Sequence, residues 1–458
     1  MTKTLQCISP IDGSVYLERP TLSRDAADTV VATARAAQAD WAARPMGERI
    51  ELVRAAVAEV GKTTDRMTLE LAHQMGRPVR YGGEFAGFEE RALHMAEIAE
   101  TALAPIIIED SNNFLRKIVR EPHGLVFVVA PWNYPYMTAI NTVAPALIAG
   151  NSVILKHATQ TLQVGERLAE AFHAAGIPTD VFQNVFLDHD TTSALIAARS
   201  FDFVNFTGSV GGGQAMERAA AGTFTPVSTE LGGKDPGYVR ADADLDAAVD
   251  GLMDGAMFNS GQCCCGIERI YVHESLYDAF VQKAVALVNT YVLGNPLETE
   301  TTIGPMANIR FAKEVRAQID EAVADGATAH VAAFAADDGG AYLTPQVLTD
   351  VTHQMRVMRD ESFGPVVGIM SVRDDDEATR LMNDSQFGLT AAIYTRDADA
   401  ADAIGARLQT GTVFMNRCDY LDPALCWTGC KDTGCGTGLS VLGFQALTRA
   451  KSYHFKKA

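Results

Sequence analysis

Hydrophobic and polar residues alternate with helical spacing through the first hundred residues. Between residues 23 and 43, apolar side chains from Ala27 to Trp41 recur every three or four positions. The same periodicity runs from Met46 to Gly76, where Pro78 is a stop signal, and again from about Phe85 to Leu103. This spacing places the apolar side chains on one face, so it predicts three amphipathic helices.

From Gly124 onward, short apolar runs alternate with helical stretches. The runs are rich in Val, Leu, Ile and Phe, as in strands that are buried on both faces. Such a rhythm predicts a parallel sheet covered by helices, with ligands bound beyond the carboxyl ends of the strands. A second α/β series begins after Gly232. The expected elements are strands at 125–130, 152–155, 181–186, 203–206 and 267–272, and helices at 245–258 and 276–292.

Two further stretches predict exposed edge strands. Residues 115–120 alternate apolar and basic side chains, and residues 452–455 near the end of the chain alternate in the same way. Folded proteins normally cover such edges, and a symmetric dimer would cover both.

Composition narrows the class of protein. A chain of 458 residues, 47% hydrophobic and 21% charged, exceeds what one core usually supports and predicts two or more lobes. The net charge of −19 argues against nucleic acid and anionic membranes as partners. No apolar run has the length of a signal peptide or a membrane span, and eight cysteines are too sparse for a disulfide framework. We therefore expect a cytoplasmic protein.

Three consecutive cysteines, Cys263 to Cys265, follow Phe-Asn-Ser-Gly-Gln at 258–262. A thiolate nucleophile needs a partly open site, N–H donors or positive charge, and a base within reach. A buried apolar cluster, a disulfide and a metal site are the alternatives. Adjacent cysteines rarely bridge, and the nearest histidine, His273, has no second ligand close by, so the metal alternative is disfavoured.

Two glycine-rich stretches supply further candidate chemistry. Thr-Glu-Leu-Gly-Gly-Lys at 229–234 sets Glu230, a possible base, among small residues. Phe-Thr-Gly-Ser-Val-Gly-Gly-Gly at 206–213 follows a strand and opens a helix, whose free N–H groups could hold a pyrophosphate. An ordinary tight turn is the alternative, because the stretch is neither the usual dinucleotide fingerprint nor a Walker loop.

Together with Ala-Pro-Trp-Asn-Tyr-Pro at 130–135, these motifs resemble the aldehyde dehydrogenase superfamily over nearly the whole chain. Lys-His-Ala-Thr-Gln at 156–160 is most similar to the bacterial succinate-semialdehyde dehydrogenase-like branch. The resemblance implies an α/β fold with a Rossmann-like cofactor lobe, an α/β catalytic lobe and a small β oligomerisation element. The implied ranges are 1–110 and 122–232 for the dinucleotide-binding domain, 233–432 for the catalytic domain, and 111–121 and 433–458 for the oligomerisation element.

The resemblance also implies roles for individual residues. Cys264 would attack the aldehyde, and the side chain of Asn133 would bind the resulting oxyanion together with the Cys264 backbone N–H. Hydride would pass to NAD or NADP, and Glu230 would activate the water that hydrolyses the thioester. Lys156, at the adenosine ribose, completes the expected catalytic group. The other expected cofactor-binding residues are Trp132, Thr159, Gly208, Ser209, Gly213, Leu231, Glu361 and Phe363. The expected substrate tunnel is lined by Tyr134, Met137, Asn141, Phe258, Cys263, Cys265, Leu421 and Trp427.

The sequence departs from the family pattern in two places. Thr159 replaces a carboxylate at the adenosine ribose, which removes repulsion of a 2′-phosphate, so we expect both coenzymes to be accepted. Gly-Cys-Gly-Thr-Gly at 434–438 stands where many members have Gly-x-Gly-Arg-Glu, so a second active-site carboxylate is missing. The unusual cysteines of this region are expected to be free thiols. They are Cys418, Cys426, Cys430 and Cys435.

Several hypotheses remain open. A dehydrogenase that passes its thioester to coenzyme A is an alternative, although that branch usually lacks the glutamate seen here at position 230. A non-catalytic binding or structural protein on the same fold is another. A semialdehyde substrate would want a basic residue in the tunnel, and Arg417 is the nearby candidate. We further expect a homodimer or a dimer of dimers.

Overall fold

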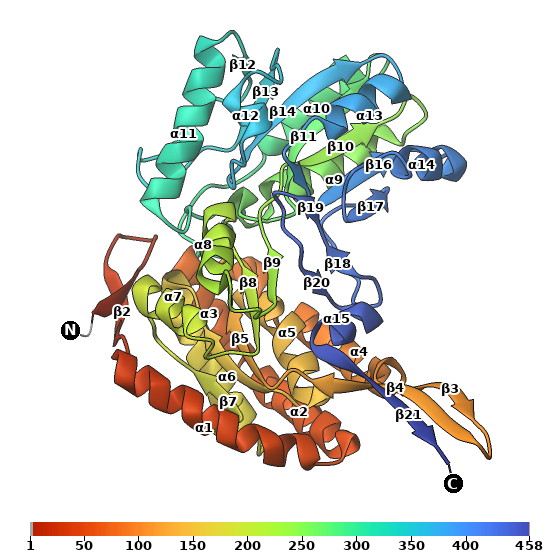
Figure 1. Cartoon of the computed structure of the whole chain (residues 1–458). Helices are drawn as coiled ribbons and strands as arrows, with labels where there is room; N and C mark the ends of the chain where they lie inside the picture. Colours follow the sequence, from red (N-terminus) through yellow and green to blue (C-terminus); the bar gives the residue numbers. More distant parts are fainter. Residues whose placement is uncertain (1–2, 458) are drawn as a thin grey trace.

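The chain forms two α/β regions, each built on its own mainly parallel sheet (Figure 1). The computed structural model describes residues 3–457. The first sheet has the order β7-β6-β5-β8-β9 and all its neighbouring strands are parallel. This confirms the expected parallel sheet. Its strands are β5 (Leu125–Val129), β6 (Ser152–Lys156), β7 (Phe182–Asn184), β8 (Phe203–Thr207) and β9 (Val227–Glu230).

Helices cover both faces of this sheet, as its buried strands require. Every residue of β5 and β6 is buried, which explains their continuous runs of apolar side chains. The helices of this region are α1 (Arg24–Ala43), α2 (Met46–Gly61), α3 (Thr64–Met75), α4 (Phe85–Ala102), α5 (Pro135–Ala149), α6 (Leu162–Ala174), α7 (His189–Ala197) and α8 (Val210–Ala220). A hairpin of β1 (Thr4–Ile8) and β2 (Val15–Pro20) precedes them.

The prediction of one helix from Met46 to Gly76 is wrong, because the chain breaks between α2 and α3. Gly61, the last residue of α2, packs against the ring of Phe85, and a Cβ there would lie 2.7 Å from the ring. Thr63 then leaves the helical region, with φ −118° and ψ 17°. The hydrophobic period continues across the break, so periodicity alone could not reveal it.

The second sheet has the order β12-β13-β14-β11-β10-β16-β17, and only the β12–β13 pair is antiparallel. The predicted strand at 267–272 is confirmed, whereas the helix predicted to reach residue 292 ends at Val288. The strands are β10 (Asp235–Val239), β11 (Ile267–His273), β12 (Thr328–Ala329), β13 (Gln346–Thr349), β14 (Val366–Val372), β16 (Thr390–Tyr394) and β17 (Thr412–Met415). The helices are α9 (Leu245–Met257), α10 (Tyr277–Val288), α11 (Ile309–Ala324), α12 (Arg356–Arg359), α13 (Asp375–Asn383) and α14 (Ala398–Gly405).

The chain passes from the first sheet to the second between Glu230 and Asp235 and returns after β17. Strands of the return path form short two-stranded ribbons, one of them with β15 from before β16, and these lie between the two regions in Figure 1. They are β15 (Phe387–Gly388) with β19 (Cys430–Lys431), and β18 (Trp427–Thr428) with β20 (Thr437–Gly438). Helix α15 (Ser440–Ala446) then packs against α4 and α5. The division into three domains stays a prediction.

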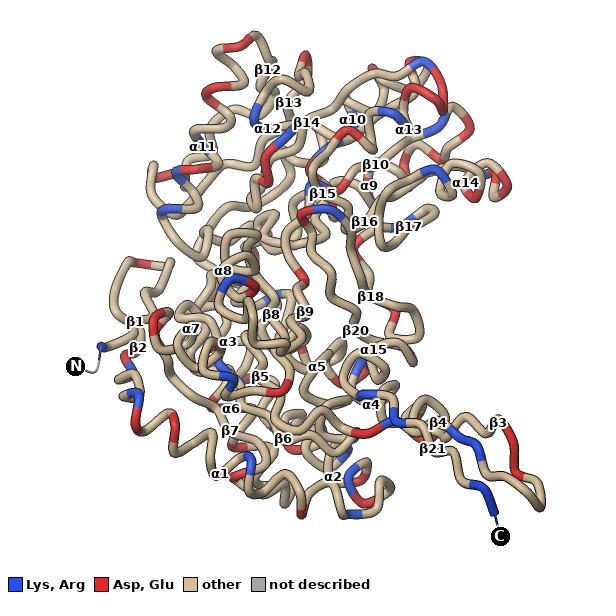
Figure 2. The backbone as a smooth tube through the Cα atoms, viewed as in Figure 1, with Lys and Arg blue, Asp and Glu red and all other residues tan. Residues whose placement is uncertain are grey.

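The last strand, β21 (Thr448–Lys456), joins β4 (Phe114–Pro122) and β3 (Ile106–Asp110) in an antiparallel sheet that projects from the body (Figure 1). The prediction that residues 115–120 form an exposed edge is wrong, because β4 is the middle strand. The free edges belong to β21 and β3. Lys and Arg are prominent along β4 and β21 in this otherwise acidic chain (Figure 2).

Within residues 3–457, no helix combines the length and the apolar character needed to span a bilayer.

Candidate active site

The cysteine triplet follows a turn with unusual backbone geometry. Asn259, Ser260 and Gly261 all have positive φ, at 54°, 57° and 68°. This conformation is unfavourable for residues with a side chain, so the surroundings must hold it. Asn259 Nδ2 donates to Gln262 O at 3.1 Å, and Ser260 Oγ donates to the carbonyl of Gly304 at 2.8 Å. These hydrogen bonds therefore fix the backbone of the turn that precedes the three cysteines.

A buried arginine ties this turn to the segment that carries Asn133. Arg77 donates to Asn259 Oδ1 at 3.2 Å, to Asn133 O at 2.6 Å and to Glu84 Oε1 at 2.6 Å. The other oxygen of Glu84 accepts the N–H groups of Tyr136 and Met137 at the start of α5, each at 2.9 Å. Sequence reasoning missed Arg77 and Glu84, because neither belongs to a motif.

Asn133 itself is buried at the start of α5, and its backbone is fixed by the contacts with Arg77 and Asn259. Within residues 3–457 its side-chain amide makes no hydrogen bond. A rigid backbone with an uncommitted amide is what an oxyanion donor requires.

The three thiols differ in exposure and in acidity. Cys263 and Cys265 are buried, whereas Cys264 is partly open. The neighbouring thiols of Cys263 and Cys265 hold the pKa of Cys264 well below its usual range, while their own pKa values are raised. Cys264 is thus the thiol best suited to attack a substrate.

The two flanking thiols share one acceptor, Asp419. Cys263 and Cys265 donate to Asp419 Oδ1 at 3.1 and 2.9 Å. Burial raises the pKa of Asp419 to about 6. The three sulfur atoms lie within 4.8 Å of one another, close enough to share a metal ion, although the sequence disfavours that role. Sequence reasoning missed Asp419, whose position near the triplet arises only from the fold.

Glu230 ends β9 and lies between the triplet and the glycine-rich C-terminal segment. Burial, and then the negative charge of Cys264, raise the pKa of its carboxyl to about 7. A Cβ at Gly438 would lie 2.9 Å from Glu230 Oε1, and a Cβ at Gly233 would lie 2.6 Å from Cys264 O. The glycines therefore allow close packing of Glu230, the triplet and residues 434–438. A carboxyl with a pKa near 7 suits a general base.

Several of the expected cofactor-binding residues converge at the carboxyl ends of β8 and β9. Ser209 caps α8 by accepting the N–H of Gly212 at 3.2 Å, while within residues 3–457 the N–H groups of Val210 and Gly211 make no hydrogen bond. Gly208 N donates to Glu230 O at 3.1 Å. A Cβ at Gly213 would lie 2.7 Å from Leu231 Cδ2, so these two residues are in contact.

Lys156 ends β6 and is buried, with 6% of its surface exposed. Burial lowers the pKa of its ammonium group to about 8, and no ion pair within residues 3–457 includes it. The neighbouring His157 has a buried Nε2 without a hydrogen-bond partner. Thr159, three residues later, is exposed. Lys156 ends β6 and the N-terminus of α8 follows β8, at the same edge of the parallel sheet with β5 between them, so the ammonium and the helix N-terminus can both bind the hydroxyls and phosphates of a dinucleotide.

Trp132, Phe363 and Glu361 lie at the other side of this site. Trp132 stacks on Phe311 with ring centroids 5.4 Å apart and meets the edge of Phe363 at 5.5 Å. Glu361 Oε1 accepts the N–H of Gly233 at 3.0 Å. Burial, and then the charge of Glu268, raise the pKa of Glu361 to about 8. These residues can provide an aromatic wall and a carboxyl for the nicotinamide half of a coenzyme.

Most of the expected tunnel residues belong to the large hydrophobic cluster that forms the core of the first region and includes the triplet, and Asn141 is buried on α5. The cluster contains Tyr134, Met137, Leu421 and Trp427 with Cys263, Cys264 and Cys265. Phe258 is not in this cluster and packs edge-on against Tyr81, 4.8 Å away. Arg417 is exposed and lies over the ring of Tyr420 at 4.0 Å. The C-terminal cysteines are free: Cys418, Cys426 and Cys430 are partly buried and Cys435 is exposed.

The model of the aldehyde dehydrogenase family matches residues 1–453. The chain is 32% identical to a succinate-semialdehyde dehydrogenase [NADP(+)] of Deinococcus radiodurans, with 97% of this chain and 93% of that protein covered. It is 31% identical to a succinate semialdehyde dehydrogenase [NAD(P)+] of Escherichia coli, with 95% and 94% covered.

Solved structures agree with these relatives. An aldehyde dehydrogenase from Brucella melitensis is similar with a TM-score of 0.94 at 30% identity, covering 100% of this chain and 94% of that one. A point mutant of betaine aldehyde dehydrogenase from Staphylococcus aureus, in complex with NAD+, gives 0.93 at 27% identity, with 99% and 94% covered. Sequence and fold thus point to one conclusion, which confirms the resemblance: the chain belongs to the aldehyde dehydrogenase family.

Proposed function

We propose that this protein oxidises an aldehyde to the free carboxylic acid, with Cys264 as nucleophile and Glu230 as general base. The proposal rests on three groups that the motifs supply and that have the properties this reaction needs. These are a partly open thiol of lowered pKa, a carboxyl with a pKa of about 7, and the uncommitted amide of Asn133.

In the proposed mechanism, the Cys264 thiolate adds to the aldehyde carbon and forms a thiohemiacetal. The Asn133 amide and the Cys264 backbone N–H stabilise the oxyanion; losing one such donor typically costs about 10²- to 10³-fold in rate. A nicotinamide coenzyme, when bound, would supply the hydride acceptor, and loss of hydride from the thiohemiacetal carbon would leave a thioester on Cys264. Glu230 then takes a proton from water, and the resulting hydroxide hydrolyses the thioester.

The mechanism is tested by following absorbance at 340 nm with purified protein, an aldehyde and coenzyme. Cys264→Ala should abolish turnover, whereas Cys263→Ala and Cys265→Ala should retain a reduced rate, because each removes only one thiol that holds the pKa of Cys264 down. If the three variants behave alike, Cys264 is not the nucleophile. If turnover needs coenzyme A and gives an acyl-CoA, the hydrolytic step is wrong.

The groups proposed to hold the coenzyme are Lys156, Ser209 and the aromatic pair of Trp132 and Phe363. We propose that both NAD and NADP are accepted, because Thr159 puts no carboxylate at the adenosine ribose. The names of the two relatives support this proposal, since one carries NADP(+) and the other NAD(P)+. Their substrate names also make a semialdehyde the first substrate to try.

We propose that a second copy of this chain covers the projecting sheet, giving a homodimer or a dimer of dimers. Ile106, Ile107 and Ile108 of β3 are 55–57% exposed, and the outer edge of β21 is unpaired within the described chain. The basic residues of β4 and β21 also complement an acidic chain (Figure 2). Light scattering should report a species larger than the monomer, and deletion of the residues after Ala450 should weaken it. The expected cytoplasmic location stays a prediction.

A further inference from the structure

Arg91 is a buried arginine on α4, on the face that packs against α5. It has 8% of its surface exposed. One turn earlier, Gly87 meets the sulfur of Met137 so closely that a Cβ there would clash with it. This close approach brings the guanidinium beside α5, where Nη1 donates to Met137 O at 3.1 Å and to Asn141 Oδ1 at 3.5 Å. Both partners are expected tunnel residues.

Within residues 3–457, Arg91 has no acidic partner. Two other buried basic groups, Arg77 and Lys234, pair with Glu84 and Glu268. The equally buried Arg269 donates through three nitrogens to backbone carbonyls. Arg91 forms no ion pair, and its Nε is buried with no hydrogen-bond partner at all. Burial of an unpaired cation is costly, and it lowers the pKa of this guanidinium. Such a cost is normally offset by an anion.

The guanidinium also lies close to the reacting groups. Its charge acts on Cys264, Cys265 and Asp419, and it opposes the rise in the pKa of Glu230 that burial causes. Asp419 is nevertheless committed elsewhere, because its Oδ1 accepts the thiols of Cys263 and Cys265. Arg91 makes no hydrogen bond to any of these groups, so its Nε donor remains for a ligand.

We propose that Arg91 binds a carboxylate at the far end of the aldehyde substrate. An arginine presents its donors in a planar fork that matches a carboxylate, and the attraction is strong in a site that excludes water. The inference rests on the proposed function and adds the substrate class: a short aliphatic aldehyde with a terminal carboxylate. It also replaces Arg417, which is exposed and stacked on Tyr420, as the candidate anchor.

The test compares succinate semialdehyde with butanal, which has the same number of carbons and no carboxylate. The native enzyme should favour the semialdehyde in kcat/KM. Arg91→Gln should lower that value about 10- to 100-fold, chiefly through KM, because a hydrogen bond to a charged group is lost. Its kcat/KM for butanal should change less than about threefold. Arg91→Lys should lie between, since lysine keeps the charge without the fork.

The matched control is Arg417→Gln, which should leave both substrates unaffected. Thermal melting of each variant verifies folding, and the rate at which iodoacetamide labels Cys264 reports its acidity. If Arg91→Gln lowers turnover of both aldehydes equally and slows the labelling, Arg91 supports the Cys264 thiolate and the carboxylate anchor is wrong. If the native enzyme does not favour the semialdehyde, the anchor is also wrong while aldehyde oxidation stands. Absence of turnover with both aldehydes, together with sluggish labelling of Cys264, would instead contradict the proposed function.

Discussion

The buried Lys234–Glu268 pair of the second region and two buried cations near the proposed active site differ in how their charges are compensated. In the second region, Lys234 Nζ lies 2.5 Å from Glu268 Oε2 and also donates to Ser362 Oγ at 2.9 Å. Glu268 accepts the N–H groups of Ser362 and Phe363 as well, each at 2.8 Å. Around the proposed active site, by contrast, Lys156 and Arg91 form no ion pair within residues 3–457.

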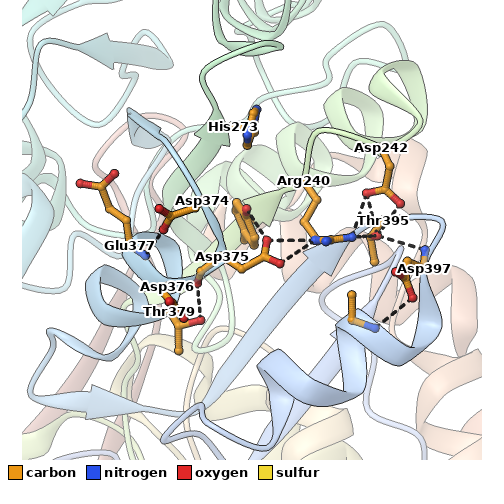
Figure 3. A network of polar contacts seen from close by, with 12 residues as sticks. Arg240, Asp242, His273, Asp374, Asp375, Asp376, Glu377, Thr379, Thr395 and Asp397 are labelled. Atoms are coloured by element: carbon orange, nitrogen blue, oxygen red, sulfur yellow. Dashed lines mark hydrogen bonds and ion pairs between the residues drawn. The ribbon is translucent and has the colours of Figure 1, made fainter.

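The same pattern of complete pairing is seen at the carboxyl end of β10 (Figure 3). Arg240 Nε donates to both oxygens of Asp375, at 2.9 and 3.2 Å. Its Nη1 donates to Asp242 at 3.2 Å and to Thr395 at 3.0 Å. This network fastens α13 and the segment before α14 to β10.

The paired charges of Lys234, Glu268 and Arg240 stabilise the fold, whereas Lys156 and Arg91 are the unpaired cations that we propose bind ligands. Burial without a partner disfavours the ionised form, so it lowers the pKa of Lys156 to about 8 and raises those of Glu230 and Glu361 to about 7 and 8. All three groups therefore titrate close to neutral pH. Such shifts are characteristic of functional sites, although they also occur in ion-pair networks.

The largest effect is expected where a paired group is broken. Lys234→Met would leave Glu268 buried and uncompensated, so the protein should lose about 3–5 kcal/mol of stability. Chemical denaturation against the native protein measures the loss. Lys234→Met combined with Glu268→Leu removes both charges and should recover a large part of it. A single variant as stable as the native protein would contradict the structural role of the pair.

Removing the unpaired carboxyl of Glu230 should impair catalysis. Glu230→Gln should lower kcat about 10³-fold, because no base remains to activate water. In the native enzyme, kcat should rise as pH increases through about 7, the pKa of Glu230, because only the ionised carboxylate accepts a proton. The profile of the variant should lack this step. A variant that retains full hydrolysis would assign the base to another group.

The same pKa fixes the sign of the stability change. The folded state binds the Glu230 proton more tightly than the unfolded chain, so stability is lost as pH rises from about 4.5 to about 7. At pH 8, Glu230→Gln should therefore be more stable than the native protein by about 1–3 kcal/mol. At pH 5 the gain should largely vanish, which denaturation at the two pH values can check.

Much of the fold follows from sequence patterns that report on buried surface. Continuous apolar runs identified β5, β6 and β8, because strands buried on both faces carry few polar residues. The break between α2 and α3 was missed, since the hydrophobic period does not change where Thr63 leaves the helical region. The alternation pattern did not predict the pairing of β4 with β21, because residues 114–122 and 448–456 are far apart in the sequence; only the family resemblance placed 111–121 and 433–458 in one element.

The residues of the candidate site also fall into those that the sequence revealed and those that only the fold brings together. Cys264, Glu230 and Asn133 stand in motifs, so their spacing was visible in the sequence. Arg91 and Asp419 stand in ordinary helical or loop sequence, and only packing brings them to the triplet. Arg417 looked suitable because it lies close to Leu421 in the chain, yet its side chain is exposed.

A partner can be supplied to one of the unpaired cations. Thr159→Glu places a carboxylate three residues after Lys156, where it would attract the ammonium and repel a 2′-phosphate. The ratio of kcat/KM for NADP over NAD should fall about 10- to 100-fold relative to the native enzyme. Thr159→Gln, similar in size but neutral, is the control and should shift the ratio much less. An unchanged ratio in the glutamate variant would show that Thr159 does not face the ribose.

The smallest effect is expected for the Arg240 network, which is more open to water than the Lys234–Glu268 pair. The Arg240 side chain is 21% exposed, and those of Asp242 and Asp375 are 38% and 36% exposed, so water and salt screen the network in Figure 3. Arg240→Met should cost only about 0–1 kcal/mol and should leave kcat/KM for aldehyde unchanged. The cost should shrink further in 1 M salt, whereas that of Lys234→Met should persist because the Lys234–Glu268 pair is shielded from solvent. Denaturation of both variants at low and high salt makes the comparison. If Arg240→Met loses as much stability as Lys234→Met, the number of hydrogen bonds in a charged network matters more for stability than its burial. The comparison between buried and exposed pairs would then be wrong.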